Sequence, residues 1–188
     1  MNLETLRSRL KTREPKRILL PRAAHAAVAL IIGPAPDGFE ALFIRRAEHP
    51  KDPWSGQVGL PGGRREPNDP DLLATAIRET REEIGVSLNS RQLLGELDDV
   101  HPSGGGLPSV TVRPFVFLAS ARPRVLPSAE VAGHFWTSLK ALRDSHRRTE
   151  IDARGTPRQV SAYCVGPNVI WGITRRILEP FVDLALGE

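Results

Sequence analysis

The chain has 188 residues, of which 40% are hydrophobic and 26% are charged, and its formal net charge is +4. These proportions are typical of a globular protein, and the length favours one domain with a substantial core. No apolar run is long enough to cross a bilayer and no signal peptide is recognisable, so we expect no membrane partner. The single cysteine, Cys164, excludes an internal disulfide and favours the reducing cytoplasm.

The positive charge comes mostly from arginine, and the pI is 9.8. This balance suits a polyanionic small molecule, although an ordinary solvated surface rich in arginine explains it equally well. Aromatic residues make up only 5% of the chain and do not alternate with the basic clusters. We therefore expect no nucleic-acid partner.

The first residues have the pattern of a short amphipathic helix. Leu3, Leu6 and Leu10 follow helical spacing within residues 1–13, and prolines at 15 and 21 then interrupt regular structure. We expect residues 1–22 to form an N-terminal helical segment and residues 23–188 to form the main domain. The helix would dock on the body or on a partner subunit, which leaves a homodimer open.

The remaining elements alternate between strands and helices. The patterns predict a hairpin of two strands, a loop over 46–59, a central helix, further strands, a solvated basic loop over 143–148 and a closing helix. The strands are expected at 23–32, 39–45, 93–100, 110–118, from 135 and 160–165, and the closing helix at 168–186. This order predicts an α+β layered domain.

The central helix is expected over residues 71–86, directly after a glycine-containing loop. Asp69 is a good N-cap, Pro70 suits the first helical position, and Gly85 suits the residue after the last turn. Apolar and β-branched residues at 73, 77, 80 and 84 share one helical face, which we expect to enter the core.

Three glutamates share another face of this helix. Glu79, Glu82 and Glu83 are spaced i, i+3, i+4, and carboxylates so close together repel one another unless a cation lies between them. Carboxylate and carbonyl oxygens suit hard cations such as Mg²⁺, and Gly62 and its neighbour would allow close backbone approach. Arg78 could hold a carboxylate by a bidentate hydrogen bond. The alternative is a solvated acidic face without a ligand.

The same stretch resembles the Nudix box, in which a Gly and a Glu precede the run Arg-Glu-U-x-Glu-Glu-x-Gly-U, with U aliphatic. Gly63 opens the motif, and residues 78–86 close it as Arg-Glu-Thr-Arg-Glu-Glu-Ile-Gly-Val. Asp69 replaces the first Glu, Thr80 replaces the first U, and the run from Gly63 to Arg78 is one residue longer than usual. The extra residue and the aspartate resemble the coenzyme A pyrophosphatase branch of the superfamily.

Two further segments resemble that branch. Gly56 and Gln57, followed by Pro-Gly-Gly at 61–63, match its upstream element, with Leu60 where Phe is common. Residues 170–174, Ile-Trp-Gly-Ile-Thr, match a run near the end of such enzymes. The resemblance implies an αβα sandwich with a mixed sheet and the box as loop–helix–loop.

The resemblance also implies the chemistry. Nudix enzymes hydrolyse a diphosphate linked to another moiety, with Mg²⁺ or Mn²⁺ held here by Gly62, Glu79, Glu82 and Glu83, while Arg78 orients the glutamates. The substrate implied is coenzyme A or an acyl derivative, cleaved to phosphopantetheine and adenosine 3′,5′-bisphosphate. The alternatives are a housecleaning hydrolase of nucleoside triphosphates or ADP-ribose, and a non-catalytic nucleotide sensor.

Residues outside the box complete the predicted site. Glu130 is the candidate base or additional ligand, with a surface-loop glutamate as the alternative. Arg45 and Arg46 are candidates for phosphate contacts, with a solvated surface charge as the alternative. Gln57 is a candidate substrate contact, and Trp54 would either stack on a base or belong to the core.

Overall fold

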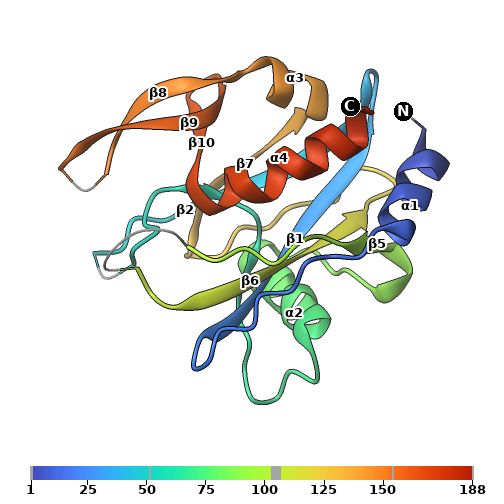
Figure 1. Cartoon of the computed structure of the whole chain (residues 1–188), viewed down its shortest axis with the longest axis horizontal. Coiled ribbons are helices and arrows are strands. Elements are labelled where there is room, and N and C mark those ends of the chain that lie inside the picture. Colours follow the sequence, from blue (N-terminus) through green and yellow to red (C-terminus); the bar gives the residue numbers. More distant parts are fainter. Residues whose placement is uncertain (1, 51, 103–106, 154, 188) are drawn as a thin grey trace.

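The computed structural model describes residues 2–50, 52–102, 107–153 and 155–187 (Figure 1). Its helices are α1 (Leu3–Thr12), α2 (Leu72–Ile84), α3 (Leu139–Asp144) and α4 (Gly172–Leu186), together with the 3₁₀-helix η1 (Ser90–Gln92). Its strands are β1 (Ala24–Ala35), β2 (Gly38–Arg46), β3 (Val58–Gly59), β4 (Gly62–Arg64), β5 (Leu93–Glu96), β6 (Val110–Leu118), β7 (Val131–Ser138), β8 (His146–Asp152), β9 (Pro157–Val165) and β10 (Asn168–Ile170).

A seven-stranded mixed sheet forms the centre of the molecule. Its main order is β3-β2-β1-β6-β5, with β4 paired to β1 and β7 paired to β2. Strand β1 runs parallel to β6 but antiparallel to β2 and β4, so both pairing types meet in one sheet. Strands β10, β9 and β8 form a separate three-stranded antiparallel sheet. The predicted α+β class with a mixed sheet is therefore confirmed.

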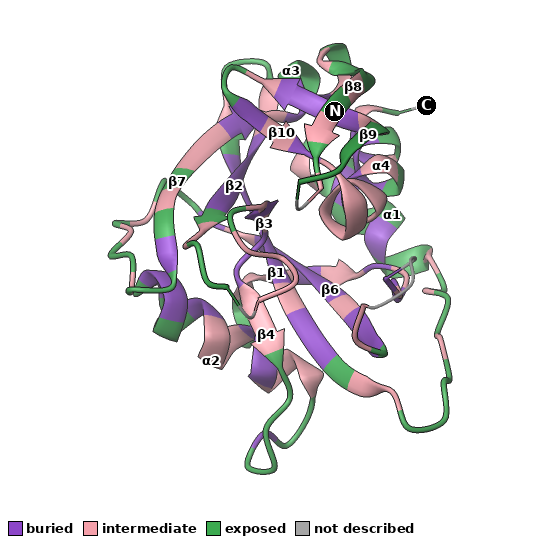
Figure 2. Cartoon of the chain, turned by 90° about the vertical axis from the view of Figure 1, so that its left-hand side faces the viewer, coloured by how far each residue is buried: buried purple, intermediate pink, exposed green. Residues whose placement is uncertain are grey.

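The central sheet is buried on both faces because successive residues of a strand point to opposite sides. Alternate residues of β1 enter two separate cores, Ala26, Leu30 and Ile32 on one face and Ala27, Ala29 and Ile31 on the other. Helix α2 covers the second face, and α1 and α4 cover the first (Figure 2). The molecule is thus the αβα sandwich that the resemblance implied.

The N-terminal helix docks on the body of this same chain. Leu6 and Leu10 are buried in the core that also contains α4. Arg9 donates a hydrogen bond to the carbonyl of Leu184 near the end of α4, and Asn2 caps α1 by accepting from the amide of Thr5. The predicted amphipathic helix is confirmed, since its apolar face is covered.

Three local predictions are wrong. Asp71, not Asp69, caps α2, because the Asp71 side chain accepts from the amide of Ala74. The segment 168–186 is not one helix: residues 168–170 pair with β9 as strand β10, and α4 begins only at Gly172. The basic run 143–148 is not a loop, since it ends α3 and begins β8, which pairs with β9.

None of the described helices combines the length and the apolar character that a bilayer span requires. The longest of them, α4, covers the central sheet and contributes Ile177, Leu178 and Phe181 to the core.

Candidate active site

Helix α2 brings its glutamates to the end of strand β4. The helix ends at Gly85, whose φ of 68° is left-handed and whose amide donates to the carbonyl of Arg81. Of the three glutamates, Glu83 is the most buried, with 4% of its side chain exposed, against 17% for Glu79 and 53% for Glu82. The three carboxylates therefore differ in environment although they share one face of the helix.

The two glycines of β4 allow the helix and the strand to approach closely. Gly62 has a φ of 152°, and a β-carbon on it would lie 2.2 Å from the carbonyl oxygen of Ala27. Its amide donates to Glu83 Oε2 at 2.9 Å. A β-carbon on Gly63 would lie 2.4 Å from Glu79 Oε1. Gly63 therefore leaves the space in which the Glu79 carboxylate lies, whereas Gly62 allows close approach to β1 and donates its amide to Glu83.

Arg78 connects the loop before α2 to the glutamates. Its Nε and Nη2 donate to the two oxygens of Asp69 at 3.0 and 2.9 Å, and its Nη1 donates to Glu79 Oε1 at 3.0 Å and Glu82 Oε2 at 2.9 Å. The bidentate partner is thus Asp69, the residue that we expected to cap the helix. These hydrogen bonds hold the pKa of Asp69 well below its usual range and raise that of Arg78.

The site carries more negative charge than its own cations balance. Burial raises the pKa of Glu83 to about 7, with further contributions from the charges of Glu79 and Glu130. Burial also raises the pKa of Glu79, although Arg78 opposes it. Buried hard-oxygen donors of this kind fit a divalent cation such as Mg²⁺. Among the described residues, no three acidic, histidine or cysteine side chains are already arranged around one ion position. The oxygen donors therefore suit a metal ion in type, but they do not form a complete coordination site.

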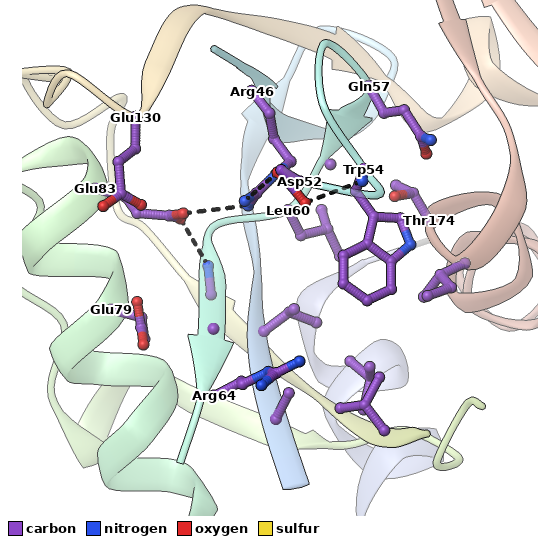
Figure 3. A pocket seen from close by; sticks show the side chains of 18 of the residues that line it. Arg46, Asp52, Trp54, Gln57, Leu60, Arg64, Glu79, Glu83, Glu130 and Thr174 are labelled. Carbon is purple, nitrogen blue, oxygen red and sulfur yellow. Dashed lines mark hydrogen bonds and ion pairs between the residues drawn. The ribbon is translucent and has the colours of Figure 1, made fainter. Parts of the chain in front are cut away.

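These side chains line one wall of a pocket of about 600 Å³ (Figure 3). Glu130 lies beside Glu83 in the close-up and comes from the turn before β7. Arg46 faces the same carboxylates, with its Nη1 3.6 Å from Glu83 Oε1. The rest of the lining includes the apolar residues Val28, Leu60, Val110, Val112 and Ile177.

The structure brings most of the predicted residues together in this pocket. Those that line it are Arg46, Trp54, Gln57, Gly62, Glu79, Glu82, Glu83 and Glu130. Arg78 lies behind the carboxylates that it binds. Arg45 lies elsewhere: it borders a second pocket and donates to Asn168 Oδ1 at 2.7 Å. Arg45 and Arg46 therefore border different pockets, because successive residues of β2 point to opposite faces of the sheet, and a phosphate contact of either arginine stays a prediction.

Sequence reasoning missed one residue of the site. Asp52 Oδ2 accepts from Nε and Nη2 of Arg46 at 3.0 and 2.8 Å, and Asp52 Oδ1 accepts from the amide of Trp54 at 3.0 Å. It therefore fixes Arg46 and the start of the Trp54 turn at once. The only local signal was an Asp-Pro pair in a polar loop, which is typical of any turn.

A family model of the NUDIX domain matches residues 23–159. The chain belongs to the Nudix family. A Nudix hydrolase from Photorhabdus laumondii, NudL, is 33% identical over 179 residues, which cover 92% of this chain and 91% of that protein. NudL of Yersinia pestis is also 33% identical, over 84% of this chain and 77% of its own length.

Solved structures agree with the fold. A MutT/nudix family protein from Enterococcus faecalis has a TM-score of 0.61 at 15% identity, over 98% of this chain and 68% of its own. The NUDIX domain of Shewanella oneidensis NrtR, solved with ADP ribose, has a TM-score of 0.53 at 20% identity. The match covers 77% of this chain and 88% of that domain's chain. As a Nudix hydrolase, the protein is an enzyme that acts on nucleoside diphosphate derivatives, and such enzymes generally use divalent metal ions.

Proposed function

We propose that this Nudix hydrolase cleaves the diphosphate of coenzyme A or of acyl-coenzyme A. The main support is that the two segments outside the box that resemble coenzyme A pyrophosphatases meet at the pocket. Thr174 Oγ1, in the segment at 170–174, donates to the carbonyl of Val58 at 3.1 Å, directly after Gln57. Gln57 and Thr174 both line the pocket next to the carboxylates.

In this proposal Glu79, Glu82 and Glu83, with the carbonyl of Gly62, hold Mg²⁺ or Mn²⁺. When bound, the metal supplies neutralisation of phosphate charge and acidification of a water molecule. Arg78 fixes the orientation of Glu79 and Glu82 through the hydrogen bonds described above.

Glu130 is the proposed base. Its carboxylate accepts a proton from the attacking water as that water adds to one phosphorus. The bond from this phosphorus to the bridging oxygen breaks, which gives phosphopantetheine and adenosine 3′,5′-bisphosphate. Arg46 is placed to contact the phosphates, because its guanidinium faces Glu83 and is held by Asp52. Gln57 and Trp54, on the same wall, are placed to contact the rest of the substrate.

The test is a substrate panel with Mg²⁺ or Mn²⁺ that contains coenzyme A, acetyl-coenzyme A, ADP-ribose and nucleoside triphosphates. We expect the highest kcat/KM for coenzyme A or its acyl form, with both named products resolved by chromatography and with activity lost in chelator. Faster hydrolysis of ADP-ribose or of triphosphates would overturn the coenzyme A assignment and favour the housecleaning alternative. Binding without turnover of any substrate would favour a sensor, which the presence of all three box glutamates argues against.

A further inference from the structure

A second pocket adjoins the first across the Trp54 turn. It has a volume of about 720 Å³ and lies between that turn, the end of β8, the start of β9, strand β10 and the start of α4. Both pockets share a wall that consists of Pro53, Trp54, Gln57, Val58 and Ile173. The two pockets are therefore adjacent, on opposite sides of these five residues.

The two pockets carry opposite charge. In the described lining of the first pocket, acidic side chains outnumber arginines even when Arg78, which binds Glu79 and Glu82 from behind, is counted with Arg46 and Arg64. The acidic residues are Asp52, Glu66, Glu79, Glu82, Glu83 and Glu130. In the described lining of the second pocket the balance is reversed, since Arg45, Arg158 and Arg176 face only Asp152. An acidic pocket needs metal cations before it can receive a diphosphate, whereas a basic pocket can bind an anion directly.

The three arginines of the second pocket differ in their hydrogen-bond partners. Arg45 donates to the neutral amide oxygen of Asn168, which orients its guanidinium without cancelling its charge. Arg176 donates to the carbonyl of His101 at 2.6 Å. Arg158 is exposed at the start of β9, and its side chain has no hydrogen bond or ion pair with any other residue that the structure describes.

Two indoles complete the second pocket. Trp54 and Trp171 both line it, and both are half-buried. Indole faces bind the planar face of a nucleobase, and arginine forks bind phosphate oxygens by charge-assisted hydrogen bonds. Indole faces combined with Arg45 and Arg158, neither of which pairs with a described carboxylate, provide the chemistry that a phosphorylated nucleoside requires.

We propose that this second pocket binds the phosphorylated nucleoside half of the substrate, and that Arg158 and Arg45 contact a phosphomonoester that lies outside the cleaved diphosphate. The inference rests on the proposed function, in which the adenosine carries a 3′-phosphate. The metal serves the diphosphate in the acidic pocket. A third phosphate group away from that metal needs cations from the protein, and of these two pockets the second has more arginines than carboxylates in its described lining.

The test compares kcat/KM for coenzyme A with that for dephospho-coenzyme A, which lacks only the 3′-phosphate. For the wild-type chain we expect a preference of roughly tenfold to a hundredfold, the scale of hydrogen bonds to a charged group. In Arg158→Ala, and more fully in the double variant with Arg45→Ala, this ratio should fall towards one. The matched control is Arg147→Ala, which removes an exposed arginine of β8 that lines neither pocket and should leave the ratio unchanged. A wild-type ratio of one, or a double variant that keeps the wild-type ratio, would overturn the inference.

A binding measurement separates this inference from the proposed function. Isothermal titration in chelator compares adenosine 3′,5′-bisphosphate with adenosine 5′-monophosphate on the wild-type and Arg158→Ala chains. We expect the bisphosphate to bind at least about tenfold more tightly to the wild type, and the difference to shrink in the variant. A wild-type chain that leaves coenzyme A intact refutes the proposed function. The titration then still shows whether the second pocket binds the additional phosphate. Equal binding of the two nucleotides would overturn the second pocket as a phosphate site.

Discussion

The carboxylate of Glu79 occupies the space that a side chain on Gly63 would need. A β-carbon built on Gly63 lies 2.4 Å from Glu79 Oε1 and 2.5 Å from its Cδ. The atoms in the way belong to the end of a flexible side chain, so Gly63→Ala should displace the carboxylate rather than the backbone. We expect turnover to fall by roughly a hundredfold or more, while the free energy of unfolding changes by less than about 1 kcal/mol.

Gly62→Ala is the comparison for this prediction. At Gly62 the β-carbon would meet the backbone of Ala27 and Val28 at 2.2 and 2.6 Å, and the φ of 152° is unfavourable for any other residue. We therefore expect a loss of about 3 kcal/mol or more in stability. Urea denaturation and steady-state kinetics of both variants test these two predictions. A fully active Gly63→Ala variant would show that the Glu79 carboxylate does not need this space.

The raised pKa of Glu83 predicts a pH-dependent stability of the metal-free chain. The folded state binds the proton more tightly, with a pKa of about 7 against the ordinary 4.5. The contribution of Glu83 to stability is thus fully present below the ordinary value and is lost as pH rises through the folded one. In chelator, Glu83→Gln should be more stable than wild type at pH 8, by about 2–3 kcal/mol, and this difference should shrink at pH 5. Urea denaturation at both pH values checks it, and a difference that does not depend on pH would contradict it.

The same variant should lose activity. Glu83→Gln keeps the shape of the side chain and its hydrogen bond from the amide of Gly62, but it removes the charge that a metal requires. We expect kcat to fall by roughly two orders of magnitude or more. Added Mg²⁺ should raise the thermal midpoint of the wild type but not of the variant. Near-normal turnover in the variant would remove Glu83 from the proposed ligands.

Glu130 is expected to act on the chemical step. Glu130→Gln should lower kcat by about a hundredfold, the scale of general-base catalysis, with little change in KM. The control is Glu150→Gln, which makes the same charge change on β8 outside both pockets and should leave the kinetics as they are. If the two variants behave alike, Glu130 is only a residue of the turn before β7.

Asp69 is expected to stabilise the fold and to align Arg78. The carboxylate is buried and accepts hydrogen bonds from Nε and Nη2 of Arg78. It also accepts one from Thr75 Oγ1 at 3.0 Å. Asp69→Asn should cost about 1–3 kcal/mol in the free energy of unfolding, the scale of a hydrogen bond to a charged group, and should also lower kcat. Because the folded-state pKa is depressed, this stabilisation is present at neutral pH and is lost in acid.

Asp71→Asn is the matched control for Asp69→Asn. It neutralises the residue that caps α2, where asparagine serves equally well, so stability and kcat should barely change. Equal effects of the two substitutions on unfolding would show that Asp69 has no special role. Circular dichroism melts and steady-state kinetics of both variants provide the comparison.

Local patterns in the sequence determined the chemistry of this protein and most of its elements. Helix α2 follows from apolar spacing and the glycine at 85, and the three glutamates share its face because of the 3.6-residue period. Strand β6 runs over the predicted residues 110–118, where β-branched and aromatic residues alternate in part with polar ones. The Gly-Gly pair and the shared face of the three glutamates predicted a divalent-cation site, and the resemblance of residues 78–86 to the Nudix box implied diphosphate chemistry.

Tertiary contacts alone decided how the side chains of the site differ. Glu83 is buried and Glu82 is half-exposed, although helical spacing treats them alike, because only Glu83 points to the amide of Gly62. Residues 168–170 became a strand because β9 was available to pair with them. Arg45 and Arg46 are neighbours in sequence but border different pockets, because successive residues of β2 point to opposite faces of the sheet and different loops cover those faces. Burial, charge partners and strand pairing all depend on residues far away in the chain, and no local pattern contains them.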